Sequence, residues 1–336
     1  MKWQEHQLNE VTESQWAEIQ AQYPEANFLQ SPAWGEVNEQ VGHKVIIAVW
    51  DQGWCLMIVK NAKRGRYLEI PGGPLMDWTD EDLRREVFQQ IKLVAEREKC
   101  VFVRLRPQLR HGEENLAILN SLGLKKAPMH LHAEHTVMLD LTKSTDELLA
   151  DMRRQTRYEV RRAGKLGMTV KYSTDTDIFQ EFHQVQLQTA ERQHFVPPDL
   201  KMLLAEHKAF GTNARMYVAR TTEGQAAAYG LILVSGTEAE YFEAASTEFN
   251  QKLPGAYALL WQAMQDLKED GVQRFNLWGI APPGQTEHRY AGVTIFKKGF
   301  GGEVVEFVPA QDMIIKRSRY QINKIIENVR KKRRHL

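Results

Sequence analysis

Strand-like and helix-like stretches alternate along the whole of this chain, and that alternation limits the folds it can adopt. Two apolar runs at 43–50 and 54–61 flank Asp51-Gln-Gly53, a pattern typical of a β-hairpin. Three further strand-like runs between 215 and 245 predict an antiparallel meander. Helical patterns separate these runs, for example at 80–98, where Thr79 is the expected cap and acidic residues come first. The sequence therefore predicts an α/β protein with mixed sheets and helices packed on them.

The pattern divides into two halves of similar content, near residues 1–142 and 143–310. The chain has 336 residues, of which 43% are hydrophobic, enough for a large core, and this length is typical of two domains or of one large one. We therefore expect two related domains. A last helix is predicted at 313–333, and its apolar positions fall on one face that would pack against a domain: Ile315, Ile322, Ile325, Ile326 and Val329.

The charge of the chain is unevenly distributed. From residue 316 onward there are nine Lys and Arg and one acidic residue, a net charge of +8, whereas the whole chain carries +1. Residues 1–315 therefore carry a net charge of −7. A basic tail on an acidic body indicates a polyanionic partner or surface.

Cysteine content and hydropathy indicate a protein of the reduced cytoplasm. Cys55 and Cys100 both lie in apolar strand-like runs, so we expect buried free thiols rather than a disulfide. The first residues show no apolar signal region, and no apolar run approaches the ~20 residues needed to span a bilayer. The expected location is the cytoplasm, with the inner face of the cell membrane as a second place where the basic tail would act.

Residues 292–303, with the sequence GVTIFKKGFGGE, form the most distinctive short segment. Phe296, Lys297 and Lys298 stand just ahead of a cluster of glycines. Glycine permits turns and close approach of the backbone. A lysine between apolar neighbours either reaches toward water or is held to meet negative charge. By itself the segment is typical of a turn at a strand edge, so its meaning depends on the rest of the chain.

A predicted helix at 145–165 carries a basic stripe on one face. Stacked like charges four residues apart cost a few tenths of a kcal/mol per pair, which the helix tolerates here. The stripe is either a solvated basic face or a ridge that binds phosphate groups. It consists of Arg153, Arg157, Arg161 and Lys165, and it is widened by Arg154 and Arg162.

Other residues indicate ligand contacts less specifically. Arg104 and Arg106 end a buried strand two residues apart, so both lie on one face, as ligand contacts or as arginines at the rim. Trp34 follows a capped short helix pattern and either lines a cleft or fills the core. The histidines at 130, 132 and 135 match no zinc spacing, so we expect no metal site.

Several common catalytic motifs do not occur in the sequence. It contains no Gly-x-Ser-x-Gly motif, no Walker loop and no Gly-x-Gly-x-x-Gly motif. These observations argue against a serine hydrolase, a P-loop kinase and a dinucleotide-dependent oxidoreductase.

Taken together and in order, the segments resemble the FemABX family of peptidoglycan peptidyltransferases. Each similar segment is weak alone, but their order and spacing extend over nearly the whole chain. The basic helix and the Phe-Lys-Lys-Gly-Phe-Gly-Gly run are the most specific parts. The similar segments are 28–34, Gly72-Gly-Pro74, the strand at 136–141, the basic helix through Gly167, Leu253-Pro-Gly255, Phe275-Asn-Leu-Trp-Gly279 and 295–303.

The resemblance implies a fold and an activity. It implies two domains related to the GNAT acyltransferase fold, the first of residues 1–142 with 311–336 and the second of residues 143–310. No extended heptad region lies between 175 and 210, so the form without a coiled-coil arm is expected. The family transfers an amino acid from aminoacyl-tRNA to an amine of the peptidoglycan stem peptide, without a metal or organic cofactor. The implied partners are aminoacyl-tRNA as donor and UDP-MurNAc-pentapeptide or lipid II as acceptor. Contact with an anionic membrane surface is also expected, and the protein is expected to be a monomer.

The resemblance also implies roles for individual residues. In the family the lysine that follows the phenylalanine stabilises the oxyanion of the reaction, and here that residue is Lys297. Substrate contacts are expected from Phe296, Lys298, Trp34, Arg104, Arg106, Tyr241 and Glu243. Contacts to tRNA or other phosphates are expected from Arg153, Arg154, Arg157, Arg161, Lys331, Lys332 and Arg333.

Three departures from the family pattern leave the acceptor open. Arg106 stands where relatives have an acid at the end of the strand, so a candidate general base is missing there. Glu36 stands where one relative has a lysine for the nucleotide diphosphate, and Glu243 stands where relatives often have tyrosine. The acceptor is therefore the UDP-linked muropeptide, lipid II or a different amine.

Two functions of other classes remain open from the sequence. A GNAT-like N-acyltransferase would use acyl-CoA or another acyl donor and would be indifferent to RNase. A non-enzymatic binder of nucleic acid or of a membrane surface would act through the basic tail and would lose all function when residues 330–336 are deleted.

Overall fold

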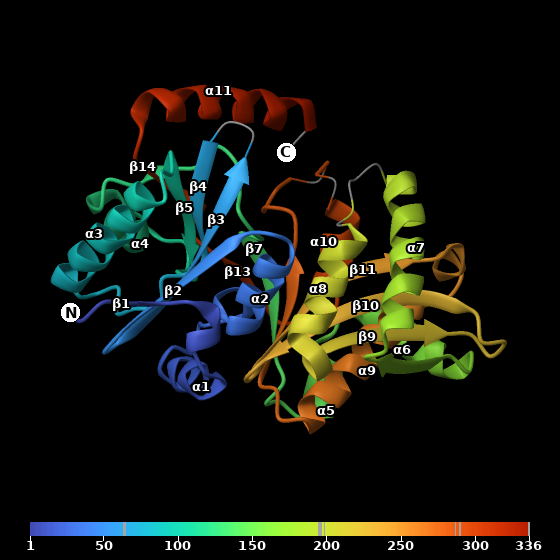
Figure 1. The fold of residues 1–336 in the computed structure, drawn as a ribbon. Helices are drawn as coiled ribbons and strands as arrows, with labels where there is room; N and C mark the ends of the chain where they lie inside the picture. Colours follow the sequence, from blue (N-terminus) through green and yellow to red (C-terminus); the bar gives the residue numbers. More distant parts are fainter. Residues whose placement is uncertain (63–64, 194–196, 198, 286, 289, 335–336) are drawn as a thin grey trace. The chain divides into compact units, whose positions relative to one another are not determined.

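The computed structural model of the chain describes residues 1–62, 65–193, 197, 199–285, 287–288 and 290–334. The chain divides into two compact units, one of Met1–Glu134 with Glu306–Leu336 and one of His135–Val305 (Figure 1). The sequence pattern placed the junctions near residues 142 and 310 instead. The first junction lies at 134 because strand β7 (His135–Asp140) pairs with a strand of the second unit.

The first unit is built on a seven-stranded sheet in the order β1-β2-β3-β4-β5-β14-β6. Neighbouring strands are antiparallel except for β4 and β5, which run parallel. The strands are β1 (Gln4–His6), β2 (Lys44–Trp50), β3 (Gly53–Ala62), β4 (Gly65–Gly72), β5 (Phe102–Pro107), β6 (Lys125–Lys126) and β14 (Gln311–Ile314). The helices are α1 (Glu13–Gln22), α2 (Pro32–Gln40), α3 (Glu81–Arg97), α4 (Glu113–Ser121) and α11 (Arg317–Arg334).

The hairpin predicted around Asp51-Gln-Gly53 is confirmed, because β2 and β3 pair in register from Lys44↔Val59 to Trp50↔Gly53. The predicted cap of α3 was off by one residue. Asp80 caps the helix, since its carboxylate accepts the backbone N–H of Leu83 at 2.9 Å, while the Thr79 hydroxyl donates to Asp77. The free thiols Cys55 and Cys100 are buried, as expected.

The end of the chain differs from the single helix predicted at 313–333. Residues 311–314 form β14, which pairs with β5 on one side and with β6 on the other. Only from Arg317 does the chain become helical, as α11. The expected orientation of that helix was also wrong, because Ile322, Ile325 and Val329 are exposed. Tertiary pairing overrode local helical periodicity at 313–314.

The second unit is also built on a seven-stranded mixed sheet, in the order β13-β7-β12-β11-β10-β9-β8. The predicted meander is confirmed, because β9, β10 and β11 pair antiparallel in sequence. Besides β7 the strands are β8 (Thr169–Ser173), β9 (Ala214–Arg220), β10 (Ala226–Ser235), β11 (Glu238–Ser246), β12 (Arg274–Gly279) and β13 (Glu303–Glu306). The helices are α5 (Thr145–Asp151), α6 (Arg154–Lys165), α7 (Thr176–Gln193), α8 (Leu200–Phe210), α9 (Gly255–Glu269) and α10 (Ala291–Lys298).

The parallel strands β11 and β12 separate partway along their length. They pair only from Glu238↔Arg274 to Glu240↔Asn276. The register of β10 against β11 shifts at Leu231/Ile232, so one extra residue of β11 bulges there. Beyond residue 240 the two strands therefore diverge, and the backbone at this point borders a gap in the ladder.

The basic helix predicted at 145–165 is two helices. The backbone is extended at Met152, with ψ of 144°, which ends α5, and α6 begins at Arg154. Met152 is buried in the core of the unit, so packing of its side chain fixes the break. Arg153 consequently precedes α6 as its N-cap residue and does not continue the helical stripe.

The expectation of a form without a coiled-coil arm is confirmed for the described residues. The segment between 175 and 210 contains α7 and α8, which pack on the sheet of the second unit rather than projecting as a long hairpin (Figure 1). Within the described part of the chain, no helix combines the length and the apolar character required to cross a membrane.

Candidate functional site

Lys297 lies in the last turn of helix α10, and not in the strand-edge turn that the sequence suggested. The glycines after it make that placement possible. Gly301 and Gly302 have φ of +86° and +81°, a region that favours glycine. A Cβ at Gly302 would lie 2.5 Å from the backbone oxygen of Met138 in β7. The glycine cluster therefore lets the chain turn tightly against β7 and holds the end of α10 at the sheet.

The Lys297 side chain is buried without a counter-charge. It is 7% exposed, its Nζ donates to the backbone oxygen of Gly279 at 2.9 Å, and it lies 5.8 Å from the centroid of the Tyr241 ring. No carboxylate among the described residues forms an ion pair with it. Burial lowers the pKa of Lys297 to about 7. A buried, uncompensated amine is an unusual feature that marks candidate functional sites.

The gap between β11 and β12 lies beside this lysine. Gly279, which accepts the hydrogen bond from Lys297, is the last residue of β12. Tyr241, the aromatic neighbour of Lys297, directly follows the last residue of β11 that pairs with β12. Trp278, directly before Gly279, has φ of +60°, which is uncommon for a side chain of this size. The amine therefore sits where the two parallel strands separate, the usual kind of place for a ligand in a sheet of this type.

Aromatic packing supports the helix that carries Lys297. Phe296 makes edge contacts with Tyr257, at 5.0 Å between ring centroids, and with Phe300, at 5.3 Å. Lys298 is exposed. The structure thus gives the two adjacent lysines opposite environments, and only Lys297 belongs to the buried site.

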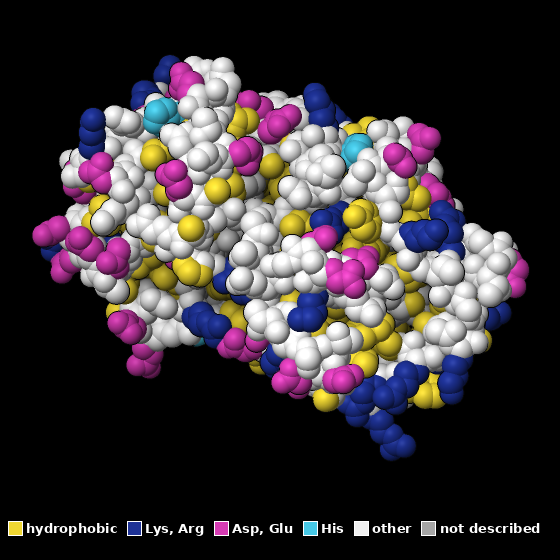
Figure 2. All heavy atoms as spheres, turned by 90° about the horizontal axis from the view of Figure 1, so that it is seen from below, with side chains coloured by type: hydrophobic (Ala, Val, Ile, Leu, Met, Phe, Trp, Pro, Cys, Tyr) yellow, Lys and Arg dark blue, Asp and Glu magenta, His cyan; other side chains and the backbone are white. Residues whose placement is uncertain are grey.

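The basic residues of α6 have mixed environments. The backbone N–H of Arg153 donates to the Gly299 oxygen at 2.9 Å, which ties this loop to the end of α10. The Arg157 guanidinium caps α5, since it donates to the backbone oxygens of Ala150 and Met152. Arg153, Arg154 and Arg161 are exposed. A group of Lys and Arg side chains is visible in Figure 2 on the side of the view where Figure 1 draws α6.

A second polar cluster lies behind β11, against α7 and α8. Glu243, partly exposed, accepts a hydrogen bond from Nε2 of Gln186 at 2.7 Å. Gln186 Oε1 and Glu206 Oε2 are both buried and have no hydrogen-bond partner within the described residues. Burial raises the pKa of Glu243 to about 7, and burial together with the charge of Glu243 raises the pKa of Glu206. The Gln186 oxygen is an acceptor, and so is Glu206 Oε2 when the carboxyl is ionised, so the ionised cluster suits a group that only donates hydrogen bonds.

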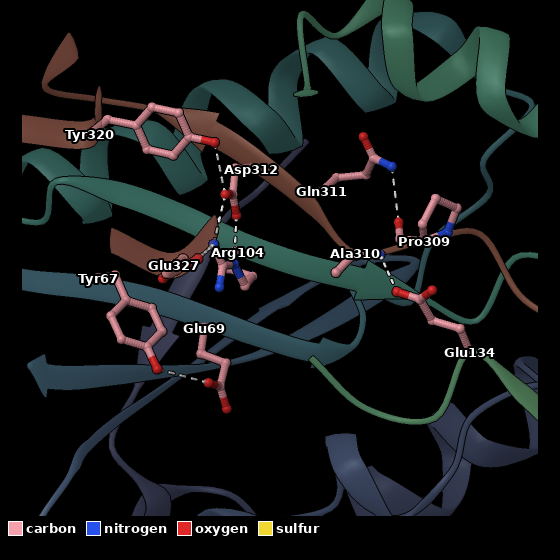
Figure 3. Close-up of polar contacts among 10 residues, drawn as sticks. All are labelled: Tyr67, Glu69, Arg104, Glu134, Pro309, Ala310, Gln311, Asp312, Tyr320 and Glu327. Carbon is pink, nitrogen blue, oxygen red and sulfur yellow. Dashed lines mark hydrogen bonds and ion pairs between the residues drawn. The ribbon is translucent and has the colours of Figure 1, made fainter. Parts of the chain in front are cut away.

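In the first unit, Arg104 belongs to a fully paired network (Figure 3). Its Nε and one terminal nitrogen donate to the two carboxylate oxygens of Asp312, both at 2.8 Å, and the same terminal nitrogen donates to Glu327 at 2.9 Å. The Tyr320 hydroxyl donates to Asp312 at 3.0 Å. Burial acts to lower the pKa of Arg104, but the bonds to Asp312 and the charge of Glu327 raise it overall. This arginine joins β5, β14 and α11.

Arg106, two residues along the same strand, has no such partners. It is 1% exposed, donates to Oε1 of the neutral Gln108 at 2.7 Å, and lies 5.1 Å from the centroid of the Phe307 ring. Its Nε is buried without a hydrogen-bond partner in the described part of the chain. Burial lowers the pKa of Arg106 to about 10, and only the charge of Glu134 opposes that effect.

The remaining predicted residues fall outside these clusters. Trp34 is 7% exposed and packs edge-on against Phe28 at 5.3 Å, within the first unit. Burial, with the nearby charge of Arg106, lowers the pKa of His132 to about 3. No group of three or more His, Cys, Asp or Glu among the described residues is placed to hold a metal ion. The side chains of Lys331, Lys332 and Arg333 lie outside the described residues.

Comparison with solved structures defines the class of fold. The crystal structure of FemX matches with a TM-score of 0.84 over 96% of this chain and 100% of that chain, at 18% sequence identity. The structure of L-PGS from Bacillus licheniformis matches less well, with a TM-score of 0.60 over 94% of this chain and 96% of that one, at 14% identity. At these identities the matches establish a shared two-unit α/β fold.

The family follows from the sequence itself. A model described as the FemAB family matches residues 11–222 and 212–328, so the chain belongs to the FemAB family. The resemblance inferred from the sequence motifs is therefore confirmed.

Curated relatives match more limited regions. The lipid II:glycine glycyltransferase of Staphylococcus aureus is 26% identical over 194 residues, which cover 53% of this chain and 46% of that protein. Aminoacyltransferase FemA of Staphylococcus epidermidis is 26% identical over 102 residues, covering 30% and 24% respectively. The chain thus spans less than half the length of these relatives.

Sequence reasoning missed the partners that give the site its character. The backbone of Gly279 and the side chains of Gln186 and Glu206 were not singled out. The segment that ends in Gly279 was recognised as a motif, but no pattern indicated that its last carbonyl would face Lys297. Glutamates and glutamines are common on helices, so the acceptor cluster emerges only when α7, α8 and β11 come together.

Proposed function

We propose that this protein is an aminoacyltransferase that moves an amino acid from aminoacyl-tRNA to an amine of a peptidoglycan precursor, UDP-MurNAc-pentapeptide or lipid II. Membership of the FemAB family and the names of the two curated relatives support the reaction class. The single observation that carries the proposal is the buried ammonium of Lys297 at the point where β11 and β12 separate. The reaction takes place in the cytoplasm, where charged tRNA is found.

The chemistry requires a positive charge more than a nucleophile. The acceptor nitrogen attacks the ester carbonyl carbon of the aminoacyl group, and the carbonyl oxygen becomes an oxyanion. The ester C–O bond then breaks, and the ribose oxygen of the tRNA leaves with a proton that was on the amine. Lys297 donates one N–H to Gly279, which leaves two for the oxyanion. A donor held in a water-poor site stabilises such charge strongly.

The pKa of Lys297 fits this role. With a pKa of about 7, the amine is only partly protonated when the site is empty at neutral pH. Negative charge that develops next to it raises that pKa and draws the protonated form into the transition state. The stabilisation is therefore larger in the transition state than in the ground state, as catalysis requires.

The cluster around Glu243 is suited to the acceptor amine. An ammonium group carries only donors. Beside Glu243, which accepts from Gln186, the buried Gln186 Oε1 and Glu206 Oε2 have no donor within the described residues. Glu243, with a pKa of about 7, is able to take the proton that the ammonium must lose before it attacks. Tyr241 and Glu243 both lie on β11, the strand that borders the gap, and their side chains leave it on opposite faces, because they pair with the neighbouring residues Ile232 and Leu231 of β10.

Anionic parts of the substrates require cationic contacts. Exposed Arg153, bonded through its backbone to the end of α10, and exposed Arg154 and Arg161 of α6 suit the phosphates of the tRNA acceptor end. Arg106 in the first unit suits a carboxylate or phosphate of the acceptor, because its guanidinium is hydrogen-bonded to no carboxylate within the described residues. Arg104 is already paired, so we assign it to the scaffold.

A reconstituted transfer assay tests the proposal. The protein is incubated with labelled mixed aminoacyl-tRNA and either UDP-MurNAc-pentapeptide or lipid II, and the product is identified by mass spectrometry. We expect an acceptor extended by an amino acid, and no product after RNase treatment of the donor. Transfer that resists RNase and depends on acyl-CoA would replace this proposal with an N-acyltransferase.

A further inference from the structure

Helix α11 packs against the first unit through its polar side. Tyr320 and Asn323 are buried, at 2% and 7% exposed, and Tyr320 donates to Asp312. Glu327, one turn further, accepts from Arg104 (Figure 3). These residues recur at the spacing of one helical face. The inward face of α11 is therefore held by hydrogen bonds and ion pairs.

The opposite side of α11 carries an apolar stripe that faces away from the unit. Ile322, Ile325 and Val329 are 57%, 63% and 46% exposed, and their spacing of three and four residues places them on one side of the helix. At 100° per residue this side lies opposite Tyr320 and Glu327. Large apolar side chains that are exposed together indicate an interaction surface.

The charged residues classed as exposed on the described turns of α11 are all basic. Lys324, Arg317 and Arg319 are exposed on the described turns of the helix. The sequence from residue 316 onward holds nine Lys and Arg and a single acid, Glu327. That acid is bound to Arg104 on the inward face. The outward side of α11 therefore presents isoleucine and valine, with Arg319 beside them and Arg317 and Lys324 exposed further around the helix.

We compared three kinds of partner for this surface, and the apolar stripe together with the basic residues favours one of them. Nucleic acid would use the positive charge but would gain nothing from the apolar stripe. A second copy of the chain would cover the stripe but would bring like charges together. An anionic lipid bilayer satisfies both features, because headgroups attract Lys and Arg while the apolar face enters the boundary with the acyl chains.

We propose that α11 docks the protein on the surface of an anionic membrane, with Ile322, Ile325 and Val329 inserted and the flanking basic residues on lipid headgroups. The helix lies in the interface and does not span the bilayer, consistent with its length and charge. This inference goes beyond the transfer reaction and does not depend on it, since binding to lipid is measured without substrates.

Vesicle co-sedimentation tests the inference with the full chain. The probe is vesicles of phosphatidylcholine with or without phosphatidylglycerol at physiological ionic strength. We expect binding to vesicles that contain phosphatidylglycerol, little binding to phosphatidylcholine alone, and at least a tenfold loss of binding in the triple variant I322S/I325S/V329S. These side chains are exposed, so the variant is expected to remain folded by circular dichroism.

A control variant at two other exposed apolar positions, and a measurement of tRNA binding, show whether the effect is specific to the stripe and to lipid. L93S/L187S removes two other exposed apolar side chains, at 50% and 43% exposed, and is expected to bind vesicles as the wild type does. The stripe variant is expected to keep its affinity for tRNA, measured by filter binding. The inference is overturned if the stripe variant binds vesicles normally, if both variants lose binding equally, or if sedimentation equilibrium shows that the stripe mediates a dimer instead.

Discussion

The buried ion pairs of Arg104 and the buried amine of Lys297 show two opposite uses of charge inside one protein. Arg104 makes hydrogen bonds to two carboxylates, and Tyr320 completes the network. Lys297 has one backbone oxygen and an aromatic ring, and no carboxylate pairs with it within the described residues. Burying a charge is costly unless it is paired. The paired arginine holds elements together, whereas the unpaired lysine is maintained at a cost in stability, as expected of a group kept for chemistry.

Other buried polar groups of the molecule also divide into those with a partner of opposite charge and those without one among the described residues. Arg106 lies on the same strand and face as Arg104, but its one side-chain hydrogen bond to a described residue is to a neutral amide, so its environment resembles that of Lys297. Glu206 and Gln186 have buried acceptors without donors, so their cluster also resembles the Lys297 site. Groups of this second kind are the ones that we assign to substrates.

The largest effect on stability is expected from breaking the paired network. Arg104→Met leaves Asp312 and Glu327 without their cation, and Asp312 is fully buried. Removing one partner of such a pair costs about 3–5 kcal/mol. Urea denaturation measures the free energy of unfolding, and Arg66→Met, at an exposed position of β4, is the control expected to change it little. A free energy unchanged in Arg104→Met would show that the network is not structural.

Removing the buried amine of Lys297 is expected to raise the free energy of unfolding, whereas removing Arg104 lowers it. The pKa of Lys297 in the folded protein, about 7, lies below its ordinary value of 10.5, so between these pH values the unfolded state holds the proton and the folded state does not. The stability of the wild type therefore rises with pH across this window. Lys297→Met is expected to be more stable at pH 7 by up to a few kcal/mol and to lose most of that pH dependence.

Denaturation curves between pH 7 and pH 10 measure this effect. Lys298→Met changes the adjacent exposed lysine and is expected to leave both the stability and its pH dependence unaltered. A Lys297→Met protein that is less stable than the wild type would mean that its ammonium is compensated, contrary to the comparison with Arg104.

A smaller change is expected at Arg106. Among the described residues no carboxylate loses a hydrogen bond in Arg106→Met, and the Gln108 amide oxygen loses a donor, which costs about 1 kcal/mol. We expect Arg106→Met to weaken binding of the acceptor more than it lowers the stability of the fold. Titration of UDP-MurNAc-pentapeptide or lipid II by calorimetry checks this, and a destabilisation as large as that of Arg104→Met would move Arg106 into the structural group.

Much of the fold could be predicted because its signals are local. The hairpin at 44–62, the meander of β9 to β11 and most helices followed from periodicity and turn residues. The exceptions depend on tertiary contacts. Residues 313–314 join a strand because β5 and β6 offer them backbone partners, and the basic helix breaks because Met152 is drawn into the core.

The candidate site was only partly predictable. Lys297 was identified by a motif, since a lysine before a glycine cluster is distinctive in sequence. Its burial and the partner oxygen of Gly279 depend on where β11 and β12 diverge, which no local pattern encodes. The apolar positions of α11 were recognised as one face. That this face is exposed to solvent could not be predicted, because it follows from the ion pair that holds Glu327 of the opposite face against Arg104.

The most direct test of the role of Lys297 is the single-turnover rate of amino-acid transfer in Lys297→Met and Lys298→Met proteins, measured with saturating aminoacyl-tRNA and acceptor. Loss of an oxyanion donor typically lowers such a rate by about 10²–10³-fold. We expect a loss of that order in Lys297→Met, although that protein is more stable, and a near wild-type rate in Lys298→Met. A wild-type rate in a folded Lys297→Met protein would contradict the assignment of the buried ammonium to the oxyanion.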